Sequence, residues 1–233
     1  MKFILTGIDP DNPETRKNGG GRALLYLHEL LHFAGHDCEI NAPVGPADIV
    51  VYPDCVQGNP CNAAKVLRYM LYFWPGERIP ASDCVIVYHE DYFDQVAQKY
   101  DRELPVENIV YIPCVEPDLF YPEEKTIEAV LFTGKLNCPD RPAEPMLEIS
   151  KTSMTRADFA ATLRKTKRLY SLDHHTIVFI EAALCGCLTW KVTDAGRGFE
   201  EVKVTNPQQY VMNPERDVAL ARKFADIALA FFK

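Results

Sequence analysis

The stretch SLDHHTIVFIEAALCGC, residues 171–187, decides the fold of the second half of the chain. Its apolar residues Ile177, Ile180 and Leu184 recur with the period of a helix, which predicts a helix over 176–186. The Cys-Gly-Cys sequence that follows ends this helix and leads into the next apolar run. The stretch therefore reads as the end of a strand, a helix and the start of another strand.

Glu181 lies inside this apolar run, and Asp173 lies eight residues earlier, just before the run begins. A carboxylate is costly to bury unless a partner pairs with it or donates hydrogen bonds to it. Two interpretations follow. Either a buried cation of the protein itself pairs with Glu181, or the partner is a bound ligand.

Similar apolar runs alternate with helix-period segments along the whole chain, a pattern typical of parallel strands joined by crossover helices. Strands are predicted near residues 2–6, 37–40, 48–52, 84–88, 109–112, 128–133, 146–149, 168–171 and 188–192. Helices are predicted near residues 21–34, 62–73, 91–100, 155–166, 176–186 and 214–232. The sequence therefore predicts an α/β fold.

The segment IPCVEPDLFYPEE, residues 112–124, interrupts the alternation with three prolines and a cluster of acids. It predicts an N-terminal domain over 1–115 and a C-terminal domain over 116–213. The last helix, within 214–233, is long enough to cross back to the N-terminal domain. A ligand is expected in the cleft between the two domains, at the carboxyl ends of the strands.

Composition excludes several classes of function. A net charge of -8 argues against a nucleic-acid binder, which needs a basic face. The eight cysteines include no CxxC pair. The apolar stretch in the opening MKFILTGIDP is too short for a secretory signal. We therefore expect reduced thiols in a cytoplasmic protein. No apolar stretch approaches the ~20 residues that span a bilayer, so any membrane contact would be peripheral.

Two local features lie at the start of the chain. In KNGGGRALLYLHELL, residues 17–31, Gly20 and Gly21 belong to a predicted turn between the first strand and first helix, where the backbone would admit an anionic ligand. An ordinary loop explains them equally well. The overlapping HELLH, residues 28–32, matches the HExxH zinc motif. The helical period instead favours a solvated histidine face opposite the leucines.

Two further loops follow predicted strands. In VLFTGKLNCPDRP, a strand ends at Gly134, and Lys135 and Arg141 in the next loop are placed to hold a diphosphate. The same two cations would also suit a solvated loop. The turn after the strand DIVVY contains Gly58 and Asn59, which predict the acceptor side of a site.

Four segments, in this order, resemble the retaining GT-B glycosyltransferases of the family 4 type, of which this chain would be a short form. They are GGGRALLYLHELLHFAGHDCEI, IVYIPCVEPDLFYPEE, AVLFTGKL and SLDHHTIVFIEAALCGC. The last resembles the Glu-x7-Glu segment of that family, with Asp173 in place of the first Glu and Glu181 as the second.

The resemblance implies two small Rossmann-like domains that face a central cleft. It also implies transfer of a hexose from a UDP- or GDP-linked donor to a carbohydrate or glycolipid acceptor, as in polysaccharide biosynthesis. No metal or other cofactor would be needed, and the configuration of the sugar would be retained. A catalytically inactive nucleotide-sugar-binding module is the first alternative, and a zinc metallopeptidase that uses HELLH, with Glu29 as its base, is the second.

The family's functional residues carry over onto matching positions of this sequence. Glu181 would accept hydrogen bonds from the ribose, and Asp173 would lie near the donor sugar. Lys135 and Arg141 would neutralise the diphosphate leaving group. The remaining donor-binding positions would be Gly20, Gly21, Gly134, His174, His175 and Thr176.

Overall fold

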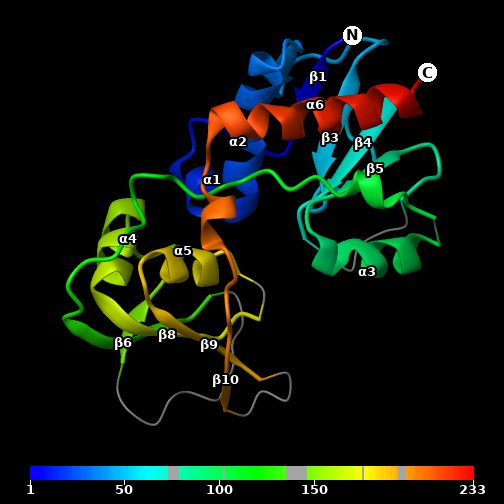
Figure 1. Ribbon diagram of the computed structural model, residues 1–233. Coiled ribbons are helices and arrows are strands. Elements are labelled where there is room, and N and C mark those ends of the chain that lie inside the picture. Colours follow the sequence, from blue (N-terminus) through cyan, green and yellow to red (C-terminus); the bar gives the residue numbers. More distant parts are fainter. Residues whose placement is uncertain (73–78, 102, 135–145, 175, 194–197) are drawn as a thin grey trace. The chain divides into compact units, whose positions relative to one another are not determined.

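The computed structural model describes residues 1–72, 79–101, 103–134, 146–174, 176–193 and 198–233. The chain forms two compact units, drawn in Figure 1. Unit 1 comprises residues 1–16, 20–113 and 213–233, and unit 2 comprises residues 17–19 and 114–212. Each unit contains one five-stranded, mostly parallel sheet, which confirms the predicted α/β class.

The sheet of unit 1 has the strand order β2-β1-β3-β4-β5, and all four pairings are parallel. Its strands are β1 (Phe3–Leu5), β2 (Cys38–Ile40), β3 (Ile49–Pro53), β4 (Lys65–Met70) and β5 (Cys84–Val87). Every residue of β1, β3 and β5 is buried, because both faces of the sheet are covered. Continuous apolar runs in the sequence thus form fully buried strands.

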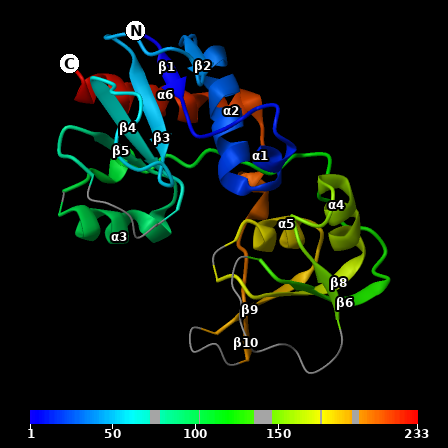
Figure 2. The same cartoon turned by 180° about the vertical axis from the view of Figure 1, so that it is seen from behind.

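Helices cover both faces of this sheet (Figures 1 and 2). On one face, Phe224 of α6 (Pro214–Phe231) packs its ring 5.2 Å from the ring of Tyr69 in β4. The Tyr26 hydroxyl of α2 (Gly19–Phe33) donates to Asp217 of α6 at 3.1 Å, so these helices lie side by side. On the other face, Val96 of α3 (Glu90–Tyr100) packs among the apolar side chains of β4 and β5. The short helix α1 (Pro13–Lys17) precedes α2.

The helix predicted over 62–73 is wrong, because residues 65–70 form the strand β4 between β3 and β5. Five of its six residues are buried, and an apolar run that is buried on both faces has no period that separates a strand from a helix. The connection from β3 is a loop held by Arg68 of β4. Arg68 donates to the carbonyl oxygens of Val56, at 3.0 Å, and Gly58, and pairs with Asp83 at 2.9 Å.

The strand predicted over 109–112 is also absent from unit 1 as described. The turn η1 (Val106–Asn108) precedes this segment, and Ile109 forms only an isolated bridge with Val87. The carbonyl of Val110 accepts a hydrogen bond from the Tyr69 hydroxyl at 2.8 Å. A side chain therefore occupies the carbonyl group that would bond to the backbone of a neighbouring strand.

Unit 2 has the strand order β7-β6-β8-β9-β10, with β10 antiparallel to β9. Its strands are β6 (Ile127–Phe132), β7 (Leu147–Ile149), β8 (Thr166–Ser171), β9 (Leu188–Val192) and β10 (Phe199–Glu201). The helices α4 (Arg156–Lys165) and α5 (Val178–Leu184) share one apolar cluster with β6 and β8. The turn η2 (Pro207–Tyr210) leads back toward α6.

Helix α5 ends where the sequence predicted. The N–H groups of Gly186 and Cys187 donate to the carbonyl oxygens of Ala183 and Ala182, both at 2.9 Å. Within the part of the chain that the structure describes, none of the helices is long and apolar enough to cross a membrane.

Candidate functional site

The strand order of unit 2 contains a topological switch point between β6 and β8. The chain leaves β6 toward β7 on one side, and it leaves β8 toward β9 on the other. In open α/β sheets, ligands bind at the carboxyl ends of the two strands at such a point, because the connections diverge there. Gly134 follows β6 and Asp173 follows β8, so both lie at this edge.

The carboxylate of Asp173 packs directly against the backbone of Gly134. A Cβ atom on Gly134 would lie only 2.2 Å from Asp173 Oδ2, and the φ angle of Gly134 is +57°. The Asp173 backbone is fixed by Ser171, whose hydroxyl accepts from its N–H and donates to its carbonyl, both at 3.0 Å. The structure therefore brings together two residues that the sequence assigned to donor binding.

Glu181 lies in α5 and is completely buried. Its Oε1 is 2.8 Å from Nη2 of Arg156, and its Oε2 is 3.4 Å from Nζ of Lys151. Both cations come from the connection between β7 and β8, Arg156 as the first residue of α4. The structure therefore contains the first of the two arrangements expected for Glu181, in which a cation of the protein itself pairs with the buried carboxylate.

Arg156 joins Glu181 to a second carboxylate. Its Nε and Nη2 atoms lie 3.2 and 2.6 Å from the two carboxylate oxygens of Glu116, and its guanidinium lies 4.5 Å over the ring of Phe120. Burial opposes the charge of Arg156, but Glu181 and then Glu116 more than offset this effect and raise its pKa above the ordinary value. The guanidinium is thus held in one orientation by two carboxylates and an aromatic face.

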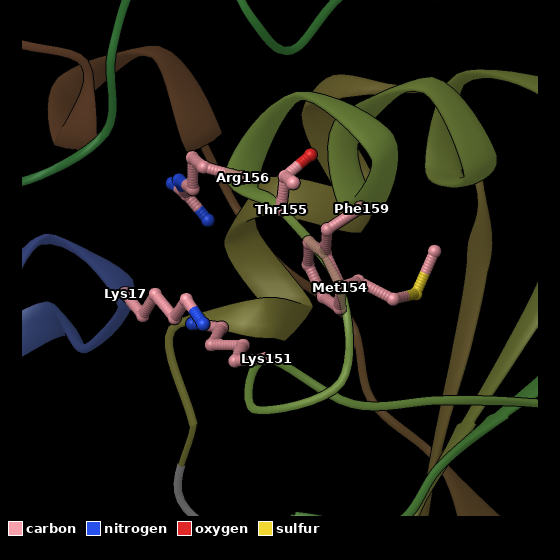
Figure 3. A pocket seen from close by; sticks show the side chains of 6 residues that line it. All are labelled: Lys17, Lys151, Met154, Thr155, Arg156 and Phe159. Carbon is pink, nitrogen blue, oxygen red and sulfur yellow. The ribbon is translucent and has the colours of Figure 1, made fainter. Parts of the chain in front are cut away.

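A shallow depression in unit 2 is lined by the cationic side of this network (Figure 3). In this view the ammonium groups of Lys17 and Lys151 meet, and the guanidinium of Arg156 lies above them. The other lining residues are Met154, Thr155 and Phe159. Three cations therefore line this depression, and two of them, Lys151 and Arg156, are paired with the buried Glu181.

The other predicted donor-binding residues of unit 2 are only partly described. His174 and Thr176 both precede α5, and the Thr176 hydroxyl accepts from the N–H of Val178, the first residue of this helix, at 3.3 Å. Lys135, Arg141 and His175 lie outside the described residues.

Gly20 and Gly21 do not form the predicted turn, because α2 begins at Gly19 and includes both. A Cβ atom on Gly21 would lie 2.2 Å from the carbonyl oxygen of Thr15 in α1. The absence of a side chain at Gly21 is therefore explained by close packing of α1 against α2.

Gly58 and Asn59 lie near the amino ends of β4 and β5, beside a hollow of about 200 Å³. The Asn59 amide oxygen accepts from the Tyr52 hydroxyl and from the N–H of Ala63, both at 3.0 Å. Its amide nitrogen donates to the Ala63 carbonyl at 2.9 Å, so Asn59 organises its own loop.

The carboxyl edge of the same sheet carries a cluster of rings that the sequence reasoning missed. Tyr72 follows β4 and is 39% exposed, and its ring lies 5.4 Å from that of Tyr92 in α3. His89 lies between β5 and α3, with its ring 6.3 Å from Tyr92 and 5.8 Å from Tyr111. Burial raises the pKa of Tyr92. The available signal was His89, directly after the predicted strand 84–88, whereas Tyr72 lay inside the wrongly predicted helix 62–73.

The HELLH residues lie on α2 as the helical period predicted. Leu24, Leu27 and Leu31 are buried, while His32 is exposed and His28 is partly exposed. The two Nε2 atoms are 3.3 Å apart. Among the residues that the structure describes, no group of three or more His, Cys, Asp and Glu side chains is arranged to hold a metal ion.

Sequence reasoning also missed Glu116, Lys151 and Arg156, which lie 65, 30 and 25 positions before Glu181 in the sequence. The sequence pointed to them only indirectly, because a buried carboxylate such as Glu181 needs a cation as its partner. In comparisons with known proteins, no family model, curated protein or solved structure matches this chain.

Proposed function

We propose that this chain is a nucleotide-sugar-dependent glycosyltransferase of the GT-B type. The observation that carries the proposal is the switch point of unit 2, where Asp173 follows β8 and the cations Lys151 and Arg156 lie beside Glu181 of the next helix. This arrangement suits a ligand with hydroxyl groups, because carboxylates accept hydrogen bonds strongly. The cations at Lys151 and Arg156 suit the phosphates of the same ligand.

In this proposal, the ribose hydroxyls replace Lys151 as the partner of Glu181, whose carboxylate is buried against Arg156 and Lys151 in the structure. Asp173 orients the donor sugar. Lys135, Arg141 and the newly found Lys151 stabilise the negative charge that develops on the diphosphate as the glycosidic bond breaks. The departing phosphate takes the proton of the acceptor hydroxyl, which attacks on the same face, so the configuration is retained. No metal ion takes part in this scheme, and the reaction takes place in the cytoplasm.

The acceptor side of the proposed reaction belongs to unit 1. The rings of Tyr72, His89 and Tyr92 at the carboxyl edge of its sheet suit a carbohydrate or glycolipid acceptor, because aromatic rings pack against apolar faces and carry polar tips. They replace Gly58 and Asn59 in this role, since those two lie near the amino ends of the strands.

The proposal is tested first by a thermal-shift panel of UDP-, GDP-, ADP- and CMP-sugars, because a ligand that binds only the native state raises the melting temperature. The donor that binds is then incubated with the protein and a chelator, with and without oligosaccharide acceptors. Transfer or donor hydrolysis in the chelator supports the proposal. Binding without turnover would instead support the inactive nucleotide-sugar-binding module, and no shift with any donor would refute both.

A further inference from the structure

The hollow of about 200 Å³ in unit 1 has no role in the proposed transfer reaction. It lies near the amino ends of β4 and β5, at the opposite edge of the sheet from the rings proposed for the acceptor. One water molecule needs only about 10–15 Å³ of such space, whereas pockets for drug-sized ligands begin near about 300 Å³. The hollow therefore has room for a ligand of the size of a monosaccharide.

A buried ion pair lies in the wall of this hollow. Arg68 and Asp83 pair at 2.9 Å, and the side chain of each is only 6% exposed. Such a pair gains little stability over apolar residues of similar volume, because both charges lose their water. Here both charged groups border space that a small ligand can enter.

The guanidinium of Arg68 has more donors than its protein partners use. It carries five N–H groups in a fixed fork. Its Nε donates to Asp83 at 2.9 Å, and its Nη1 and Nη2 donate to the carbonyl oxygens of Val56, at 3.0 Å, and Gly58. These bonds hold the loop after β3 and use one N–H of each nitrogen. The second N–H of Nη1 and that of Nη2 remain for a ligand oxygen.

Two further polar side chains line the hollow. Asn59 donates one of its two amide N–H groups to the Ala63 carbonyl at 2.9 Å. The Ser82 hydroxyl donates to Asp83 at 3.3 Å, so its oxygen can still accept. Beside them, a Cβ atom on Gly58 would meet no atom within 4 Å, so this part of the hollow is open. The other lining residues are apolar: Ala63, Ala64, Val66 and Pro80.

We propose that this hollow binds a neutral monosaccharide or a cyclic polyol of similar size. A hydroxyl group both donates and accepts, which matches donors at Arg68 and Asn59 and an acceptor at Ser82. The C–H surface of the ring packs against Ala64 and Pro80. Arg68 and Asp83 are the charged side chains among the described lining residues, and their charges cancel, which favours a neutral ligand over a sugar acid or a sugar phosphate. The site is independent of the proposed transfer reaction.

The test is a titration of the whole protein, followed by NMR, with D-glucose, D-galactose, D-mannose and myo-inositol. The Nε–H signal of Arg68 and the backbone N–H signals of Gly58 and Ser82 report on the hollow. Wild type is compared with Ala64→Leu and Ala81→Leu. Both alanines are exposed, so the larger side chain leaves the fold intact, but of the two only Ala64 lines the hollow. Leucine therefore fills part of the hollow at position 64 and not at position 81.

We expect at least one of the four polyols to shift these signals of wild type until they saturate, with a dissociation constant in the millimolar range, because a ligand this small makes few contacts. Ala64→Leu should bind it at least about tenfold more weakly, whereas Ala81→Leu should keep the affinity of wild type. Cyclohexanol, a ring of similar size with a single hydroxyl group, should also bind wild type at least about tenfold more weakly.

Three results would each overturn the proposal. In the first, none of the four polyols shifts the signals. In the second, Ala64→Leu binds as tightly as wild type, or Ala81→Leu loses as much affinity as Ala64→Leu. In the third, cyclohexanol binds as tightly as the polyols, so the hollow does not recognise hydroxyl groups. None of these results depends on transfer activity, so they are separate from the test of the proposed function.

Discussion

The carboxylate of Glu181 has no exposed surface, and Arg156 and Lys151 balance its charge. Removing one member of a buried ion pair leaves the other charge uncompensated. Arg156→Met is therefore expected to lower the free energy of unfolding by about 3–5 kcal/mol. Urea denaturation followed by circular dichroism measures this change.

Arg164 provides a matched control in the same helix. It also lies 4.5 Å over an aromatic ring, that of Tyr121, and pairs with Glu123 at 2.9 Å. Its carboxylate partner is 31% exposed, whereas Glu181 is 0% exposed. Arg164→Met should cost only about 1 kcal/mol, since pairs near solvent contribute little. Equal losses in the two variants would contradict the importance given to burial at Glu181.

His28 gives a prediction for pH. Burial and the neighbouring His32 lower its pKa in the folded state, whereas hydrogen bonding to Cys38 and the charge of Glu29 oppose the shift. The unfolded chain therefore binds the proton more readily, and the stability that neutral His28 contributes is present above pH ~6.5 and is lost as pH falls below it. His28→Gln should lose less stability than wild type between pH 7.5 and 5.0 in urea denaturation. If His28→Gln loses as much stability as wild type over this pH range, the pH dependence comes from groups other than His28.

At the scale of elements, the packing of α1 on α2 depends on Gly21. A methyl group there would meet the Thr15 carbonyl oxygen at 2.2 Å, and a backbone atom cannot move aside as a side chain does. Gly21→Ala is expected to cost about 1–3 kcal/mol in the free energy of unfolding, although alanine favours helices.

Gly19→Ala is the control for this prediction. A Cβ atom there would meet only side-chain atoms within 4 Å, those of Ile177 at 3.4 Å and the Sγ atom of Cys114 at 3.7 Å, which are ordinary contacts. It should leave the midpoint of unfolding nearly unchanged. If both substitutions destabilise the protein alike, the Thr15 contact is not the cause of the loss.

Most elements could be predicted from the sequence because their apolar patterns are local. The helix 176–186 was found as α5, Val178–Leu184, from its period and its Cys-Gly-Cys ending. The strand β4 was taken for a helix because its run KVLRYM is buried on both faces and has no period. The loop that takes the place of a crossover helix is held by Arg68, a contact that no local pattern reveals.

The candidate site was predicted only in part, for a similar reason. Asp173 could be placed because it follows the end of a predicted strand, and Glu181 because it lies inside a predicted helix. Their partners could not, since Arg156 reaches Glu181 across 25 positions and Glu116 across 40. Which cation meets a buried carboxylate is decided by the packing of α4 against α5, and the sequence states only that one is needed.

At the scale of the whole molecule, the two sheets share one strand order, although the last strand of unit 2 is antiparallel. Each has its first strand between the second and the third, so each has a switch point at its carboxyl edge. Unit 2 places carboxylates and cations near its edge, and unit 1 places aromatic rings there. This division of chemistry suits a charged donor in one unit and a carbohydrate acceptor in the other.

The measurement that tests the central claim most directly is a thermodynamic cycle on Glu181 and the ribose. The tightest nucleoside diphosphate of the thermal-shift panel and its 2′,3′-dideoxy analogue are titrated calorimetrically into wild type and Glu181→Gln. Circular dichroism checks that the variant, which is expected to be less stable, remains folded.

Wild type should bind the analogue about 10- to 100-fold more weakly, because hydrogen bonds to a charged acceptor are lost, at about 1.5–3 kcal/mol. Glu181→Gln should distinguish the two ligands far less, since its amide is a weaker acceptor. The same discrimination in both proteins would show that Glu181 does not bind the ribose. Its carboxylate would then serve only the ion pairs with Arg156 and Lys151.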